Sequence, residues 1–112
     1  MHAQLALYEH TDCGETQNAI TLDIINDRLW FTTQKQFYAG DMPVFSIRLG
    51  WKRRITFRSR LVQFAGRLSG ENVYVGDFLD IHPDDLTEIR AVILGSDARS
   101  AQGSLVGSAC AA

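Results

Sequence analysis

Several features that define other protein classes are scarce or missing in this sequence. Its 112 residues include only two prolines and two cysteines. Cys13 and Cys110 are too few for a disulfide framework, which is typical of proteins from a reducing compartment. No apolar run approaches the roughly 20 residues that span a bilayer, and the first residues lack the basic start and apolar stretch of a signal peptide. These absences predict a soluble, cytoplasmic protein.

Helical periodicity is also scarce. Before residue 83 the apolar residues recur with a period of two, which predicts a chain built mainly of β-strands. Within residues 20–33, Asn26 and Asp27 tolerate positive φ and are expected to close a tight hairpin. The expected cross-strand partners form one apolar face: Ile24 with Leu29, Leu22 with Phe31, and Ile20 with Thr33. The same register sends Ile25 and Trp30 to the opposite face, so Trp30 needs a cover.

Two more hairpins are expected, pairing residues 45–49 with 55–61 and residues 62–68 with 73–81. Gly50 and Gly70 mark their turns, while Gly66 and Gly76 mark bulges or corners inside the strands. Alternation in the first of these hairpins predicts an outer face made of small and charged residues: Ser46, Arg48, Thr56, Arg58 and Arg60. With an opening strand over residues 4–9, the chain is expected to form a mainly β fold, a small barrel or sandwich of about six antiparallel strands.

The segment 81–95 supports two interpretations. As a helix it has His82 as N-cap, Pro83 as first residue and Gly95 at its end. Its β-branched residues favour instead a single helical turn at residues 83–86 followed by a strand. Both interpretations place one short helix or helical turn near the C-terminus.

The domain organisation follows from composition. We expect a single β-rich domain over residues 1–95 and a Gly/Ser/Ala-rich tail over residues 96–112. The tail has too few apolar side chains to bury much surface. If it is ordered, a neighbouring subunit is the expected partner.

Acidic residues are missing from the middle of the chain. Residues 42–70 contain seven basic residues and no acid, whereas both flanking segments are acidic and the whole chain has a net charge of −2. Like charges that face one another across strands destabilise a sheet unless something anionic lies between them. Three sources of negative charge are considered: the chain's own Asp77 and Asp80, an acidic patch on another copy of the chain, and a phosphate-bearing ligand.

The basic segment supplies the candidate ligand site. Its members are Arg48, Arg54, Arg58, Arg60 and Trp51, since guanidinium groups bind anions and an indole ring stacks on planar groups. A pI of about 5.8 argues against avid, non-specific binding of nucleic acid.

Exposed apolar residues supply a candidate subunit interface, composed of Ile25, Trp30, Phe37 and Tyr38. In the alternative interpretation, the segment 34–44 folds back over Trp30 and buries it within the monomer.

Two arginines of the basic segment invite a family comparison. The spacing of Arg54 and Arg58 resembles the arginine pair that opens the motif of PilZ cyclic-dinucleotide receptors, which are also small β-barrels. The resemblance covers these two positions. The family's second element requires Asp or Asn, then Ser, then Gly, but Asn72 is followed by Val-Tyr-Val before Gly76. Membership is therefore not predicted.

Metal-binding and catalytic residues are sparse. One possible cluster contains His10, Asp12, Cys13 and Glu15, and the other contains Asp77, Asp80, His82, Asp84 and Asp85. His10 and Cys13 have the spacing of half a zinc site, but no second pair follows. A Cys13 thiolate with His10 as its base lacks any sign of an oxyanion hole. We expect a polar loop in the first segment, a helix start in the second, and neither a metal nor a cofactor.

The sequence thus predicts a non-enzymatic binding or interaction module that acts as a homo-oligomer. Its outward arginines would meet an acidic protein partner or an anionic small ligand, and no membrane. A nucleic-acid or nucleotide-binding small β-barrel is the alternative. A small enzyme with a pocket between subunits is the third hypothesis.

Overall fold

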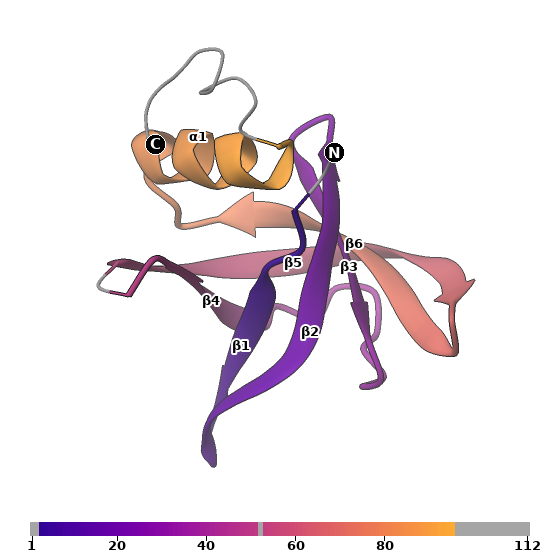
Figure 1. The fold of residues 1–112 in the computed structure, drawn as a ribbon. Coiled ribbons are helices and arrows are strands. Elements are labelled where there is room, and N and C mark those ends of the chain that lie inside the picture. Colours follow the sequence, from indigo (N-terminus) through magenta and orange to yellow (C-terminus); the bar gives the residue numbers. More distant parts are fainter. Residues whose placement is uncertain (1–2, 52, 96–112) are drawn as a thin grey trace.

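The computed structural model describes residues 3–51 and 53–95. It confirms a mainly β fold with one C-terminal helix, and the predicted tail lies outside the described residues (Figure 1). Six antiparallel strands close into a barrel in the order β1-β2-β3-β6-β5-β4. The elements are β1 (Ala6–Thr11), β2 (Gly14–Ile25), β3 (Arg28–Thr33), β4 (Val44–Leu49), β5 (Arg53–Leu68), β6 (Glu71–Leu79) and α1 (Pro83–Ile93).

The turn between β2 and β3 forms where the sequence predicts it. Asn26 and Asp27 have φ of 54° and 61°, the left-handed conformation that a two-residue hairpin turn requires. Ile24 lies opposite Leu29 as expected, but a bulge between Thr21 and Asp23 shifts the remaining register. The predicted pairs Leu22 with Phe31 and Ile20 with Thr33 are therefore wrong. Phe31 lies opposite Thr21, whose side chain is buried, and Thr33 lies opposite Ala19.

β5 is a single strand of 16 residues, where two strands were expected. Its first part pairs with β4 up to Arg58, and its second part pairs with β6 from Arg58 to Leu68. Beyond Arg58 the connection between β3 and β4 takes the place of β4. Ser59 donates its backbone N–H to the Pro43 carbonyl, and Leu61 exchanges hydrogen bonds with Gly40 and Asp41.

The helical interpretation of the last segment is correct. His82 caps α1 by accepting a hydrogen bond from the backbone N–H of Asp84 to its side chain, and Pro83 opens the helix. Ile89 and Ile93 are fully buried in the core, so α1 covers one end of the barrel (Figure 1). Within the part of the chain that the structure describes, no helix has the length and apolar character needed to traverse a bilayer.

Aromatic rings fill the opposite half of the core. Phe31 lies at the centre, with ring centroids 5.3 Å from Phe45, 6.0 Å from Tyr74 and 6.3 Å from Phe37. Phe37 donates its backbone N–H to the Tyr74 hydroxyl at 2.9 Å. Only 6% of Phe37 is exposed. Its expected place on an outer interface is thus corrected: the segment after β3 turns inward and uses this ring to close the barrel.

Gly76 is required by a close approach between β6 and β5. A Cβ at this position would overlap the hydroxyl of buried Ser59 and lie 3.1 Å from a Leu61 methyl group. We expect Gly76→Ala to lower the free energy of unfolding by about 1–3 kcal/mol because the interior cannot expand without strain. Chemical denaturation measures the change.

The control for this prediction is Ser59→Ala, which removes a buried hydroxyl that has no hydrogen-bond partner among the described residues. Alone it should be nearly neutral, and combined with Gly76→Ala it should restore most of the lost stability. Additive losses in the double variant would contradict the overlap.

Candidate functional site

The arginines of the predicted ligand site lie on the outer wall of the barrel, where they contact acids of the same chain. Arg60 lies 3.2 Å from Asp77, which also binds Arg28 at 2.9 Å. Arg58 lies 3.6 Å from Asp80. Asp77 and Asp80 are the internal acids that the sequence suggested. The middle segment therefore draws its counter-charge from the flanking segments.

Glu15 is the acid partner of the arginines at the other end of this wall. Its carboxylate oxygen Oε1 accepts hydrogen bonds from Arg48 at 3.0 Å and from Arg54 at 2.6 Å. The Arg48 guanidinium also lies over the Tyr8 ring, 4.1 Å from the centroid, which is a cation–π contact. Four neighbouring strands thus contribute to one cluster, in which two arginines share one carboxylate.

The pKa of Glu15 reports this arrangement. Partial burial raises the pKa of its carboxyl, but the charges of Arg54, Arg48 and His10 and the hydrogen bond from Arg48 lower it, and the net pKa lies below the ordinary value of 4.5. The carboxylate therefore stays ionised as a structural counter-ion.

Beside Glu15, a serine and a histidine resemble part of a catalytic triad. His10 Nε2 contacts Ser46 Oγ and also lies 3.2 Å from Glu15 Oε2. A triad needs serine and carboxylate on different ring nitrogens, whereas both contacts here use Nε2. Ser46 was expected to point outward to solvent, but it is 0% exposed. Its hydroxyl lies 3.1 Å from that of Thr56, so the cluster links neighbouring strands of the barrel.

The two possible metal clusters do not assemble. Among residues 3–51 and 53–95, no group of three or more ligating side chains is placed to hold a metal ion. His10 and Glu15 do meet, but Cys13 is an exposed free thiol on the turn before β2. In the second cluster, His82 caps the helix, and Asp85 pairs with Arg53 at 2.6 Å. These residues have structural roles.

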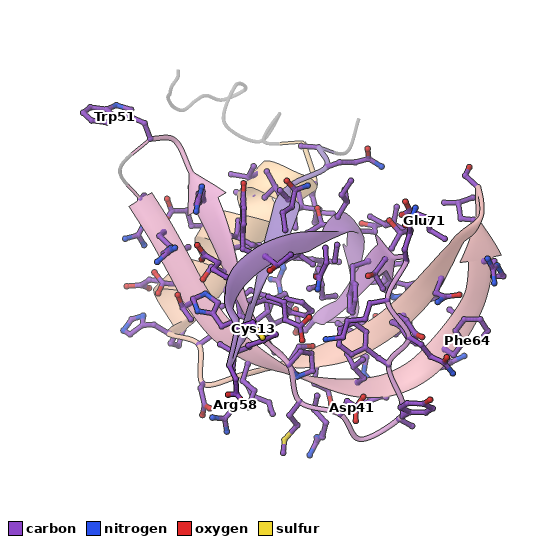
Figure 2. The ribbon with its side chains drawn as sticks, turned by 90° about the horizontal axis from the view of Figure 1, so that it is seen from below. Cys13, Asp41, Trp51, Arg58, Phe64 and Glu71 are labelled. Atoms are coloured by element: carbon purple, nitrogen blue, oxygen red, sulfur yellow. The ribbon has the colours of Figure 1, made fainter. Side chains whose placement is uncertain are left out.

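Trp51 is separated from most of the predicted ligand site. It lies at the turn between β4 and β5, is 88% exposed, and extends from the body of the molecule (Figure 2). Arg58 belongs to the last residue pair of the β4–β5 ladder, at the opposite end of this hairpin. The five candidate residues therefore do not converge on one site.

The remaining residues of the predicted interface also lie on separate surfaces. Ile25 and Trp30 line a hollow of about 360 Å³ on the outer face of β3 and β6, together with Gln63 and Val75. Trp30 is half-buried there. Tyr38 lines a different hollow at the end of the barrel. The three exposed or half-buried residues thus belong to two surfaces.

Tyr38 belongs to the larger of these hollows, which we call the lower groove and define by Tyr38, Phe64, Arg67, Asn72 and Tyr74. Its volume is about 450 Å³, within the range of ligand-binding pockets. Tyr38 is 65% exposed and Phe64 is 54% exposed. Figure 2 shows Phe64 at the rim of the molecule, far from Trp51. Large aromatic surfaces left open in this way are typical of binding sites.

Two register shifts in β5 place Phe64 and Arg67 in the lower groove. The shifts occur between Leu61 and Gln63 and between Phe64 and Gly66. Each one exchanges the inner and outer faces of the strand. Phe64 therefore lies opposite core-facing Tyr74 and contacts its ring, with centroids 5.6 Å apart. The sequence analysis missed this groove, although Gly66 was correctly assigned to a bulge.

Arg67 differs from the other described arginines of the basic segment. Its guanidinium donates to the Gly70 carbonyl at 2.8 Å, and no carboxylate of a described residue lies within salt-bridge distance. Among the described residues of the basic segment, Arg67 is thus the cation without an acid partner, and it lies in the lower groove.

A second hollow adjoins the lower groove across Tyr38. It has a volume of about 250 Å³ and is lined in part by Tyr38, Asp41, Met42 and Pro43. Asp41 Oδ2 accepts the backbone N–H of Tyr38 at 2.8 Å. Within the described part of the chain, no cation pairs with this carboxylate. Tyr38 therefore lies between an acid and a base that form no ion pair with any described residue.

Comparison of the chain with models of known protein families, with curated proteins and with solved structures gives no match. The function is therefore inferred from the geometry of the described residues.

The lowered pKa of Glu15 yields a pH-dependent prediction. Because the folded pKa lies below the unfolded value, Glu15 stabilises the protein above about pH 4.5, and this contribution disappears as the pH falls through the folded value. We expect Glu15→Gln to be less stable than the wild type at neutral pH, with a difference that shrinks on acidification. Denaturation curves at several pH values measure it.

Glu71→Gln is the matched control, because Glu71 forms no ion pair with a described residue. A Glu15→Gln penalty that persists unchanged at acid pH would show that the two arginines do not act on the Glu15 charge.

Proposed function

We propose that this protein is a non-catalytic interaction module that binds a protein surface through the lower groove. The observation that carries the proposal is the convergence of exposed Tyr38 and Phe64 with unpaired Arg67 in one hollow. Aromatic residues and arginine dominate the binding energy of protein interfaces: aromatic rings bring large contact area with few rotatable bonds, and the planar guanidinium adds directed hydrogen bonds and charge.

The internal ion pairs support this choice over binding through the outer arginines. An anionic partner of Arg58 or Arg60 would have to compete with Asp80 or Asp77, and one at Arg54 would compete with Glu15. Surface ion pairs are individually weak, but breaking one offsets the gain from a new one. A partner at Arg67 meets no such competition from the described residues.

The adjoining hollow supports a partner larger than a small molecule. Met42, which lines it, is 54% exposed, so apolar surface continues across Tyr38 from one hollow to the next. An extended surface with an apolar centre and charged edges fits the usual composition of a protein interface.

The lower groove can be tested with the dye anilinonaphthalene sulfonate, an aromatic anion that fluoresces on apolar surfaces. We expect the native protein to bind it and Phe64→Ser to weaken binding about tenfold, equivalent to about 1.4 kcal/mol, because a large aromatic contact is lost. Fluorescence titration at neutral pH measures the affinity.

Trp51→Ser provides the matched control, because it removes an aromatic side chain that is also exposed but lies at the β4–β5 turn. Dye binding that is unchanged in Phe64→Ser and weakened in Trp51→Ser would contradict the assignment of the groove.

Nucleic-acid binding is tested separately with a single-stranded oligonucleotide at low and high salt. We expect weak binding that Arg58→Ala and Arg60→Ala leave unchanged, because both side chains already have acid partners. Tight binding that weakens steeply with salt and is lost in these variants would favour the nucleic-acid function instead.

A further inference from the structure

The charges around Tyr38 have a self-complementary arrangement. Arg67 lines the lower groove, Asp41 lines the adjoining hollow, and Tyr38 lines both. A two-fold axis brings the same surface of two copies together in opposite orientations, so that a residue away from the axis on one copy meets a different residue of the other, and the reciprocal contact also forms. Two unlike charges on either side of a projecting residue are suited to such an axis.

We propose that the partner seated on the lower groove is a second copy of this chain, related by a two-fold axis, with Arg67 of each copy paired to the Asp41 carboxylate of the other. This inference rests on the proposed function, since it uses the same groove. Each of the two charges lacks an oppositely charged partner within its own described chain, and the dimer supplies both at once.

The shape of this surface is consistent with the same arrangement. Tyr38 projects with 65% of its surface exposed, and a hollow lies on each side of it. The two-fold axis allows the Tyr38 ring of each copy to enter a hollow of the other, where Phe64 and Met42 offer apolar contacts. Burying these side chains drives association, and the paired charges fix its orientation.

Other surfaces of the molecule define a partner less well. The hollow beside Trp30 has no unpaired charge that would define its occupant, because Arg28 there is paired with Asp77. In the cluster around Glu15, both arginines already contact the Glu15 carboxylate. The surface on both sides of Tyr38 is thus where shape and charge together specify an occupant.

Charge reversal tests the proposal. Arg67→Glu and Asp41→Lys are prepared separately, and sedimentation velocity is measured for each alone and for their equimolar mixture. In each variant alone, like charges would face one another across both halves of the interface, and we expect dimer affinity to fall by about tenfold or more. In the mixture every contact is again between unlike charges, so a heterodimer should form with affinity near that of the wild type.

Two further variants distinguish loss of the intermolecular charge pair from a local disturbance of the structure. Asp41→Asn keeps an oxygen that can accept the Tyr38 backbone N–H and removes only the charge, so it should weaken the dimer less than Asp41→Lys. Arg58→Glu reverses a charge at a different part of the surface and should leave dimer affinity unchanged.

Because a second copy on the groove would exclude the dye, dye binding is measured at a dilution at which the dimer has dissociated. The two sets of results then separate this proposal from the function on which it rests. A monomeric wild type at every concentration, or a mixture that does not recover dimer affinity, would overturn the two-fold arrangement. If the wild type is monomeric while Phe64→Ser still loses dye binding, the groove binds a different protein. If Phe64→Ser retains both dye binding and dimer formation, the assignment of the groove fails as well.

Discussion

The short pairing between β4 and β5 within the closed barrel is the constraint on which the rest of the structure depends. The β4–β5 ladder ends at Arg58, although β5 continues to Leu68. The connection between β3 and β4 must therefore satisfy the edge of β5, and it does so through hydrogen bonds to Ser59 and Leu61. This connection inserts Phe37 into the core and leaves Tyr38 outside. The lower groove is the space between this connection and the remainder of β5.

The charged residues of the described surface fall into two groups, those with an oppositely charged partner and those without one. A middle segment without acids would repel itself on a barrel wall, and acids from distant parts of the chain relieve that repulsion. Glu15 pairs with two arginines at once, and their charges lower the pKa of its carboxyl. The binding surface is then expected where this internal pairing stops, at Arg67 and Asp41.

Local signals predicted much of the fold, and long-range contacts were harder to foresee. The turn at Asn26 and the cap at His82 depend on residues that are adjacent in sequence, so they could be identified directly. Asp77 was expected near the arginines because it lies on the strand that pairs with the basic segment. The bulge near Leu22 contains no glycine that would have indicated it in the sequence. A register shift of one residue was enough to change every later pair in that hairpin.

The candidate site was less predictable for the same reason. The sequence correctly selected Tyr38 as an exposed apolar residue, but Phe64 reaches the same groove only after a register shift in β5. Glu15 could not be paired with Arg54 in advance, because 39 residues separate them and closure of the barrel brings them together. Sequence alternation describes a regular strand, whereas this site is made by the irregular ones.

A dilution series followed by nuclear magnetic resonance tests the central claim most directly. If two copies meet at the lower groove, the backbone signals of Tyr38, Phe64 and Arg67 change as the dimer dissociates, while those of Trp51 and Arg48 stay constant. Signals that change only on the outer arginine wall, or that do not change with concentration at all, would contradict the account.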